Sequence, residues 1–369
     1  MKPTVLFISH ESGQGIGGST YSLYNHIKSL EDEITPIVVS SAGDAYDFLV
    51  KNGIPCFKTP MRMRLHVMQI GKPKFKCFRR LISTYFLNFF TILFLAVKFR
   101  NKVDIIHSNS TAIDIGYWLA KILSVKHVWH IREFLTLDHK LTPLLGNSYL
   151  SKLIHSSYKI CISKTIAQHY GCGEDSVIYN AIDDEKNIQS IDPKEKYFLF
   201  AGGWNENKGI FDLLPVFKEF SKSHPEYALY LTGNFRSFNE QRDSHLLDKN
   251  IKILGYRTDL RELMHKASAL LMCSKFEALG RVTIEASFAG CAVIGNANGG
   301  ATAEIIKNGE TGWLYKTNEE FFKCLCEVAS NEPEVNRRIR NSQSYARENF
   351  TRQVYKKKVT MLYRSILES

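Results

Sequence analysis

Short apolar runs alternate with longer segments of helical spacing along the chain, and this alternation restricts the fold more than any other feature. Runs such as TVLFIS, DIIHS, YFLFAGG and AVIGNA are apolar throughout, which is typical of strands buried on both faces. A segment with helix-like spacing follows each run, and parallel strands with helical crossovers produce this order. The sequence therefore predicts an α/β fold built from doubly wound parallel sheets.

The chain is long enough for two such sheets. Its 369 residues exceed the size at which one hydrophobic core usually stops growing. The alternation also breaks at a polar, charged stretch, NAIDDEKNIQSIDPKEK, at residues 180–196. We therefore expect two Rossmann-like domains, residues 1–190 and 191–350, that face each other across a cleft. Residues 351–369 are expected to form a C-terminal helix that packs back on the first domain.

A glycine-rich stretch, HESGQGIGGSTYSL at residues 10–23, follows the first apolar run and contains G-x-G-x-x-G. In a dinucleotide-binding fold the first glycine ends the strand, and an acid after the second strand holds the ribose. Here three residues separate the run from Gly13, and the second run ends in VVSSAG without an acid. This context disfavours a nicotinamide dehydrogenase. Two interpretations remain: a simple turn, or a turn ending at Gly17 and Gly18 before a phosphate-binding helix start.

The stretch KFEALGRVTIEASFAG places Glu277 and Glu285 eight residues apart. Gly280 is expected to start a helix, with Glu277 in the preceding loop and Glu285 one to two turns inside. Two carboxylates in this arrangement can accept hydrogen bonds from a sugar and from a ribose, while the helix start holds a diphosphate. Two glutamates on a solvated helix face are the alternative interpretation.

With its surroundings, this stretch resembles the retaining GT-B glycosyltransferases of family 4 (glycosyl transferases group 1), whose E-x7-E motif lies in the donor site. The resemblance implies the GT-B fold and a hexosyltransferase that moves a sugar from a nucleotide-diphosphate sugar, with retention, to a glycan or lipid-linked glycan. It also implies a role in bacterial cell-surface polysaccharide synthesis. The matching segments, in order, are GIGGSTYSL, VDIIHSNS, CISKTIAQHYG, VIYNAID, GGWNENKGI and GYRTDLRELMHKASALLMCSKFEALGRVTIEASFAG.

The resemblance also implies roles for individual residues. Glu277, His130 and Lys208 become the catalytic candidates: Glu277 beside the hydroxyls of the donor sugar, Lys208 on the diphosphate, and His130 beside the sugar. His130 is also open to a purely structural interpretation, as a histidine at a strand end. The remaining donor-binding candidates are Gly17 and Gly18 on the diphosphate, Gly280, Arg281 and Val282 at the helix start, Glu285 on the ribose, and Tyr256 and Arg257 near the base.

One position departs from the family pattern. The family usually has an arginine after the first glycine of the Lys208 loop, and this chain has Gly203 there. Arg281 or Arg132 are the candidates for the missing charge. No metal is expected, because Lys208 and helix amides can stabilise the leaving diphosphate, and a UDP-sugar is expected as donor rather than a GDP-sugar. The alternatives are a nucleotide-sugar 2-epimerase of GT-B fold and a non-catalytic nucleotide-sugar-binding subunit.

The positive charge is concentrated in one segment. The chain carries a formal net charge of +11, and twelve of its 48 Lys and Arg residues lie between Asp47 and Asp104, where no acidic residue occurs. No nucleic-acid-binding motif accompanies this charge, so no nucleic acid is expected. We expect residues 58–102 to meet an anionic membrane surface instead.

The same segment contains an uncharged, mostly apolar stretch, Leu81–Val97, about 26 Å long as a helix, against a bilayer core of roughly 30 Å. A helix buried in the first domain and a helix resting on the membrane with its exposed face are both consistent with this stretch. The eight cysteines are scattered without a C-x-x-C pair, and no secretory signal is recognised. A cytoplasmic protein, peripheral on the inner face of the plasma membrane, is therefore expected.

Overall fold

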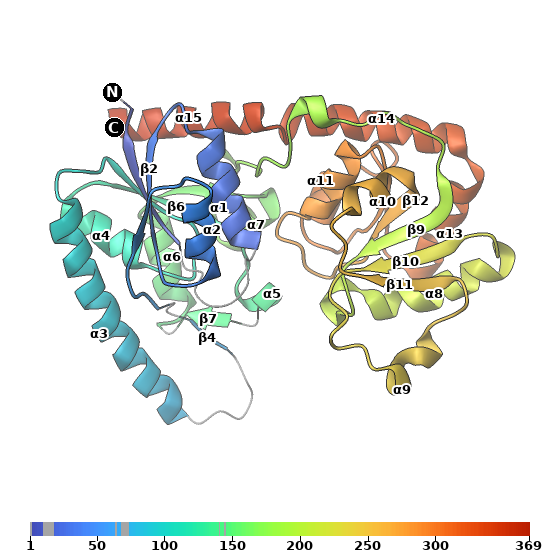
Figure 1. Cartoon of the computed structure of the whole chain (residues 1–369), viewed down its shortest axis with the longest axis horizontal. Helices are drawn as coiled ribbons and strands as arrows, with labels where there is room; N and C mark the ends of the chain where they lie inside the picture. Colours follow the sequence, from blue (N-terminus) through green and yellow to red (C-terminus); the bar gives the residue numbers. More distant parts are fainter. Residues whose placement is uncertain (1, 10–17, 63–64, 68–73, 140, 144) are drawn as a thin grey trace. The chain divides into compact units, whose positions relative to one another are not determined.

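The computed structural model describes residues 2–9, 18–62, 65–67, 74–139, 141–143 and 145–369 (Figure 1). These residues fall into two compact units. Unit 1 comprises Met1–Ala181 and Tyr355–Ser369, and unit 2 comprises Ile182–Val354. Each unit is built on its own parallel sheet of six strands.

The sheet of unit 1 has the strand order β3-β2-β1-β5-β6-β8. Every neighbouring pair is parallel, and Val5 of β1 lies opposite Pro36 on one side and Ile105 on the other. The order reverses direction between β1 and β5. The strands are β1 (Thr4–Ile8), β2 (Thr35–Ser40), β3 (Cys56–Lys58), β5 (Ile105–Ser108), β6 (Lys126–Ile131) and β8 (Tyr158–Cys161).

Helices cover both faces of this sheet. The core on one face is formed with α1 (Gly18–Ser29), α2 (Asp44–Lys51) and the end of α15 (Arg352–Glu368), and the core on the other with α3 (Lys74–Phe99) and α4 (Ile115–Leu123). Tyr355, Val359, Tyr363 and Ile366 of α15 are all buried in the first of these cores. The smaller elements are β4 (Leu65–Val67) and β7 (Leu141–Pro143), which pair antiparallel, and α5 (Thr136–His139), α6 (Asn147–His155) and α7 (Lys164–His169).

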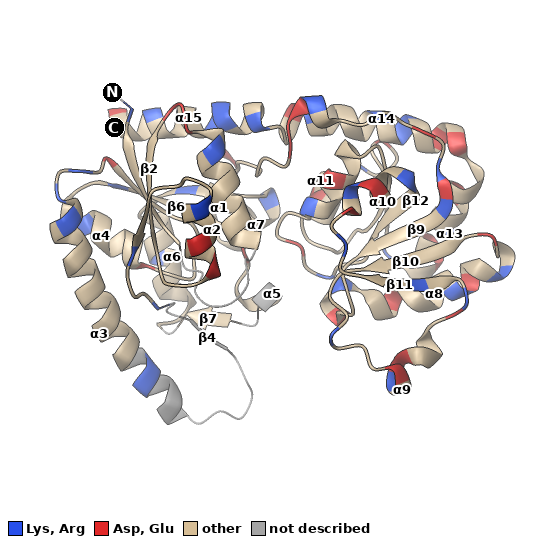
Figure 2. Cartoon of the chain, in the orientation of Figure 1, with Lys and Arg blue, Asp and Glu red and all other residues tan. Residues whose placement is uncertain are grey.

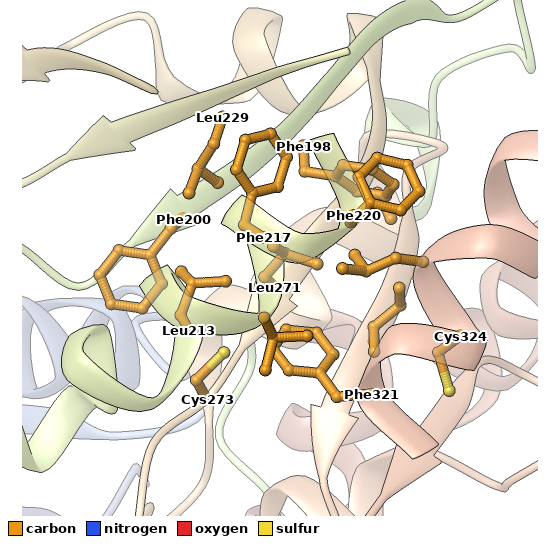
Figure 3. Packing of buried hydrophobic residues seen from close by; sticks show 14 of the residues in the cluster. Phe198, Phe200, Leu213, Phe217, Phe220, Leu229, Leu271, Cys273, Phe321 and Cys324 are labelled. Atoms are coloured by element: carbon orange, nitrogen blue, oxygen red, sulfur yellow. The ribbon is translucent and has the colours of Figure 1, made fainter. Parts of the chain in front are cut away.

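The sheet of unit 2 has the strand order β11-β10-β9-β12-β13-β14, again with parallel pairing. Aromatic side chains from the central strand β9 pack against α8 and α13, and Figure 3 shows Phe198, Phe217, Phe220 and Phe321 in this core. The strands are β9 (Glu195–Ala201), β10 (Ala228–Thr232), β11 (Ile251–Gly255), β12 (Ala267–Met272), β13 (Ala292–Asn296) and β14 (Trp313–Tyr315). The helices are α8 (Ile210–Ser223), α9 (Glu240–Asp243), α10 (Leu260–Lys266), α11 (Arg281–Phe288), α12 (Thr302–Ile305), α13 (Asn318–Ser330) and α14 (Glu332–Asn349).

The two parallel sheets confirm the doubly wound α/β fold that the sequence predicts. The division between the units falls after Ala181 and again after Val354, whereas the sequence places the boundaries at 190/191 and 350/351. Backbone hydrogen bonds explain the first difference: Ile182 donates to Phe350 O, and Gln189 donates to Phe288 O. The polar stretch therefore lies on unit 2 over most of its length.

Asp183, the first acid of that stretch, is not freely solvated. Asp183 is half-buried and forms an ion pair with Arg261, and its Oδ1 accepts a hydrogen bond from Asn187 Nδ2 at 2.6 Å. Burial alone would raise the pKa of Asp183, but the hydrogen bonds from Asn187, the Asp184 amide and Arg261 outweigh it and lower the pKa. Asp183 thereby anchors the start of unit 2.

Candidate functional site

The strand order of unit 2 reverses direction between β9 and β12. Chain connections run from β9 outward to β10 and β11 and then return to β12 on the other side. In doubly wound sheets, the loops at the carboxyl ends of the two strands flanking this point form the usual ligand-binding crevice. Lys208 follows β9 and Glu277 follows β12, so both catalytic candidates of unit 2 lie on these two loops.

Close backbone packing brings the two loops together. Lys275 N donates to Asn207 O at 3.0 Å, which ties the segment after β12 to the short 3₁₀ turn η3 (Glu206–Lys208). Gly209, directly after Lys208, has φ +78°, and a Cβ on it would lie only 2.1 Å from Cys273 O. Only glycine fits there, because any side chain would push the Lys208 loop away from the end of β12.

Glu277 is held through its backbone by the loop after β13. Its N–H donates to Gly299 O at 3.2 Å, and Ala301 N donates to Glu277 O at 2.9 Å. Gly300 lies between these two contacts with φ +67°, and a Cβ there would lie 2.6 Å from Glu277 O. The position of the Glu277 carboxylate is therefore set by a glycine loop on a neighbouring strand.

Lys208 and Glu277 form an ion pair at the reversal point. Lys208 Nζ lies 2.6 Å from Glu277 Oε1, and the side chains are 39% and 15% exposed. An ammonium group has three donors and a carboxylate has two oxygens, so each partner can contact a ligand while the pair stays intact. This pair offers a fixed positive charge for a phosphate beside an acceptor for hydroxyl groups.

Glu285 lies in the second turn of α11, and Gly280, with φ +71°, occupies the position before the helix. Arg281 Nη2 lies 3.4 Å from Glu285 Oε1, so the guanidinium of Arg281 faces along its own helix. Glu285 also lines a pocket of about 220 Å³ together with Asp183 and Arg261. Val282 packs partly buried against the apolar core under α11, so only its backbone can serve a ligand.

The loop after β11 carries the two candidates for contact with a base. Tyr256 is 83% exposed. Arg257 is held by Asp259, with Nε 2.8 Å from Oδ1. Gly233 N donates to Gly255 O at 2.9 Å, which joins the ends of β10 and β11 just before Tyr256. Tyr256 and Arg257 thus follow β11, two strands away from β9, at the same edge of the sheet as Lys208 and Glu277.

Gly203 has no room for a side chain. It has φ +65°, and a Cβ on it would lie 2.4 Å from Asn234 O. The loop is closed there by two hydrogen bonds, from Gly203 N to Thr232 O and from Trp204 N to Asn234 O, both 2.9 Å. An arginine at this position therefore requires a different path of the loop after β9.

Replacing Gly203 with alanine is expected to destabilise the protein by about 2 kcal/mol more than replacing Gly309. Both glycines have positive φ, which costs an L-residue roughly 1–2 kcal/mol. Gly309 has open space around a Cβ, whereas Gly203 meets the Asn234 backbone, and overpacking of this kind costs about 1–3 kcal/mol. Urea unfolding of the two variants measures the difference, and equal losses would contradict the geometry of this loop.

The candidates of unit 1 lie on β6 and at the start of α1. Gly17 lies outside the described residues, and Gly18 is the first residue of α1. His130 and Arg132 occupy the end of β6 and the position just after it, and both are buried. Arg132 donates to Asn109 Oδ1 at 3.0 Å and to Asn180 Oδ1 at 2.9 Å, so its guanidinium is fixed inside unit 1.

His130 ends a chain of buried hydrogen bonds that begins on α15. Arg132 Nη2 lies 3.1 Å from His130 Nδ1, and because a guanidinium can only donate, Nδ1 accepts and Nε2 carries the proton. His107 Nε2, also 3.1 Å from His130 Nδ1, then donates, and His107 Nδ1 accepts from Tyr363 Oη at 2.7 Å. His26 Nε2 donates to Tyr363 Oη at 3.1 Å and accepts from Tyr355 Oη through Nδ1.

This order assigns one neutral tautomer to each of the three histidines. Burial lowers the pKa of His26, His107 and His130 well below 6.5, and the charge of Arg132 adds to the effect in each case. The Asn180 side chain opposes the shift of His130 as the smallest cause. Within the described part of the chain, His130 Nε2 forms no hydrogen bond of ordinary geometry. His130 therefore presents a neutral, buried N–H donor.

The sequence did not single out His26, His107, Tyr355 or Tyr363. His26 lies one position before the buried Ile27 on the inner face of α1, where a histidine is easily taken for a filler of the core. One signal in the sequence could have identified them: α1, β5 and α15 each carry a histidine or tyrosine, whose polar groups need hydrogen-bond partners when buried. Among the described residues, no group of three or more His, Cys, Asp and Glu could hold a metal ion. Metal independence therefore stays a prediction.

Residues 181–345 match the family model described as Glycosyl transferases group 1. Glycogen synthase of Mycobacterium tuberculosis is 28% identical over 152 residues, which span 38% of this chain but only 36% of that protein. An uncharacterised glycosyltransferase of Methanocaldococcus jannaschii is 24% identical over 86% of each chain. The Escherichia coli UDP-Gal:α-D-GlcNAc-diphosphoundecaprenol α-1,3-galactosyltransferase is 24% identical over 63% of this chain and 68% of its own.

Solved structures share the fold over the full length. HepE of Anabaena, in complex with UDP and glucose, superimposes with a TM-score of 0.76 at 18% identity, covering 98% of this chain and all of that one. The same protein in complex with UDP-glucose gives a TM-score of 0.74. This likeness and the two doubly wound sheets establish the GT-B fold. Residues 181–345 therefore match the group 1 glycosyltransferases, within a chain that has the GT-B fold.

Proposed function

We propose that the chain is a hexosyltransferase that moves a sugar from a UDP-sugar to a glycan or lipid-linked glycan, with retention of configuration, in bacterial cell-surface polysaccharide synthesis. The observation that carries this proposal is the Lys208–Glu277 pair at the reversal point of the sheet in the group 1 domain. The UDP and UDP-glucose complexes of HepE support a UDP-sugar as the donor, and the diphosphoundecaprenol substrate in the name of the Escherichia coli relative supports a lipid-linked acceptor.

In the proposed reaction, the acceptor oxygen forms a bond to the anomeric carbon while the bond from that carbon to the diphosphate breaks. The acceptor's proton passes to the leaving diphosphate, so no protein nucleophile takes part. Lys208 stabilises the charge that develops on the diphosphate, and Glu277 orients the sugar through its hydroxyls. Glu285 holds the ribose at the second turn of α11, and His130 donates its Nε2–H beside the sugar. We place the reaction on the cytoplasmic side of the plasma membrane, with the protein attached peripherally.

The test is to incubate the protein with a panel of UDP- and GDP-sugars and measure nucleotide diphosphate release with and without glycan and diphosphoundecaprenol-linked acceptors. Release that depends on an acceptor, with the α- or β-configuration of the donor kept in the product by NMR, supports the proposal. Conversion of the donor without an acceptor would instead identify a 2-epimerase. Nucleotide-sugar binding without turnover of any donor would identify a non-catalytic binding subunit.

Lys208 is expected to matter more for this reaction than Arg281. The Lys208 ammonium lies at the reversal point, whereas the Arg281 guanidinium is already engaged by Glu285 on its own helix. Lys208→Met should lower kcat/KM by roughly tenfold to a hundredfold, the value of one charge-assisted hydrogen bond, and Arg281→Met by less. Steady-state kinetics decide the ranking, with the exposed Lys222→Met as control. The reverse order would mean that Arg281 binds the diphosphate.

A further inference from the structure

Helix α3 has two opposite faces whose residues follow the same spacing. Its polar side chains lie on the buried face and its largest apolar side chains on the exposed face, which is the reverse of the usual arrangement. The buried face and the exposed face each follow an i, i+4, i+7, i+8, i+11, i+12, i+15 pattern, displaced by two residues, which is about 200° around a helix. The buried face consists of Thr84, Asn88, Thr91, Ile92, Leu95, Ala96 and Phe99. The exposed face consists of Ile82, Phe86, Phe89, Phe90, Leu93, Phe94 and Val97, and we call it the α3 apolar face.

The polar residues of the buried face fix the helix in this rotation. Asn88 accepts from Arg62 N at 3.1 Å through its Oδ1 and donates to Arg62 O at 2.9 Å through its Nδ2. Thr91 Oγ1 donates to Pro60 O at 2.7 Å. Leu95 and Phe99 continue the same side into the apolar core under β1. The α3 apolar face therefore cannot turn inward without breaking these contacts.

The α3 apolar face leaves large side chains in contact with water. Phe86, Phe90 and Val97 are 63%, 62% and 82% exposed, and the other four members are each at least 41% exposed. Single exposed apolar residues are ordinary, but a contiguous row of seven on one helix is typical of a surface that another apolar medium covers.

Positive charge borders this face and negative charge is absent from the segment. Arg79 and Arg80 are exposed near the start of α3, and Lys98 and Arg100 are exposed at and just after its end. No acidic residue occurs between Asp47 and Asp104. Figure 2 shows the helix uncharged along its middle with blue only toward its ends. An apolar face bordered by basic residues is the pattern of a helix that lies in the surface of an anionic membrane.

The topology distinguishes a helix on the membrane from a helix through it. Ile82–Phe99 is long and apolar enough to cross a bilayer by length and composition. However, β1 before it and β5 after it are paired neighbours in one sheet, and the inner face of α3 is part of the core of unit 1. A crossing would require that core to open, whereas lying flat uses the face that is already exposed.

We propose that the α3 apolar face docks unit 1 on an anionic bilayer, with Phe86, Phe89, Phe90, Phe94 and Val97 entering the boundary between headgroups and acyl chains. Basic residues at the two ends then contact lipid phosphates. This proposal deepens the peripheral location given above by naming its surface, but its test requires no transfer activity.

The test is flotation of the full chain with vesicles of phosphatidylcholine alone or with about a third phosphatidylglycerol, a composition that supplies anionic lipid. The triple variant Phe86→Ser, Phe90→Ser, Phe94→Ser is expected to bind the anionic vesicles at least about tenfold more weakly than wild type. A matched control, Ile122→Ser with Met361→Ser, removes exposed apolar residues of α4 and α15 in the same unit and should bind as wild type. Equal binding of the triple variant and wild type would overturn the proposal.

Charge is tested separately. Arg79→Gln with Arg80→Gln should weaken binding about 25-fold at low salt, about fivefold for each charge, and added salt should reduce the difference. Lys357→Gln with Lys358→Gln on α15 carries the same change of charge at an exposed site away from α3 and should have little effect. Equal losses in the two pairs would mean that net charge, not the α3 surface, attracts the lipid.

The competing occupant is a second copy of the chain. Sedimentation velocity without lipid, run on wild type and on the triple variant, measures self-association through the same face. Membrane docking would be overturned if wild type formed a dimer, the triple variant stayed monomeric and neither vesicle was bound. The face would then be assigned to a dimer. Circular dichroism confirms that each variant is folded, which is expected because the exchanged side chains are exposed.

Discussion

Replacing Glu277 with alanine is expected to reduce sugar transfer by roughly a hundredfold while the fold stays intact. The change removes an ion pair between the two loops of the reversal point, with Lys208 Nζ at 2.6 Å, and removes the acceptor for the sugar hydroxyls. One charge-assisted hydrogen bond contributes about 1.5–3 kcal/mol, which alone corresponds to about tenfold to a hundredfold. Displacement of Lys208 from its position adds to this loss.

Two controls separate this effect from general damage. Glu285→Ala should chiefly weaken binding of free UDP, measured by calorimetry, because its carboxylate lies on the second turn of α11 rather than on the loop. Glu219→Ala removes an exposed glutamate paired only locally with Lys222 and should leave both activity and binding unchanged. Wild-type turnover of a well-folded Glu277→Ala protein would refute the proposed role of Glu277.

The sequence predicts the central strands of both sheets well, because they are buried on both faces and read as continuous apolar runs. Val5 to Ile8 and Phe198 to Leu199, for example, have no exposed surface at all. The edge strands β3 and β14 were not predicted. Each has three residues, so Cys56–Lys58 and Trp313–Tyr315 are too short to show a period, and only their pairing in space defines them.

The candidate site was predictable in its residue types but not in its geometry. The E-x7-E spacing and the lysine loop indicate Glu277 and Lys208, yet their contact depends on glycines at 209 and 300, whose close approaches involve residues far along the chain. The same holds for Gly203. In the sequence it is notable only as the position where the family usually has an arginine, whereas in the fold a glycine is required there because a side chain would clash with the Asn234 backbone. Long-range backbone contacts of this kind leave no local pattern.

The rotation of helix α3 is another feature that could not be predicted from the sequence. Its sequence is apolar nearly all round, so periodicity cannot say which side faces the core. Only the hydrogen bonds of Asn88 and Thr91 with the segment around Pro60 and Arg62 select the rotation. Polar residues thus direct this helix inward, and the more apolar side is the one that stays exposed.

Unit 1 is expected to lose stability steeply as the pH falls below about 6.5. Four histidines of this unit, His26, His107, His127 and His130, have a pKa lowered by burial, that of His127 to about 3. In the unfolded chain each returns to a pKa near 6.5 and takes up a proton as the pH falls below that value. The folded state cannot protonate His26, His107 or His130 without breaking the chain of neutral tautomers, and His127 is buried with its two ring nitrogens paired to Ser108 and Ser157.

The sign and size follow from proton linkage. The unfolded state binds more protons, so the stability of unit 1 is fully present above pH 6.5 and falls toward lower pH. Each histidine contributes at most about 1.4 kcal/mol per pH unit, so the four together reduce the free energy of unfolding by at most about 4 kcal/mol between pH 6.5 and 5.5. A loss of that size is a large share of the stability of a typical domain.

Urea unfolding at a series of pH values from 7.5 to 5.5, followed by circular dichroism, measures this dependence (roughly, the slope counts the protons taken up). His127→Gln provides the matched control: it removes one of the four groups at a site where Ser108 and Ser157, each 2.9 Å from a ring nitrogen, can still pair with an amide. The variant should be less stable at neutral pH, and its slope should be smaller by about one proton. A stability that does not change between pH 7.5 and 5.5 would show that the histidines take up protons in the folded protein over the same pH range as in the unfolded chain, and the neutral tautomer assigned to His130 would then not be maintained.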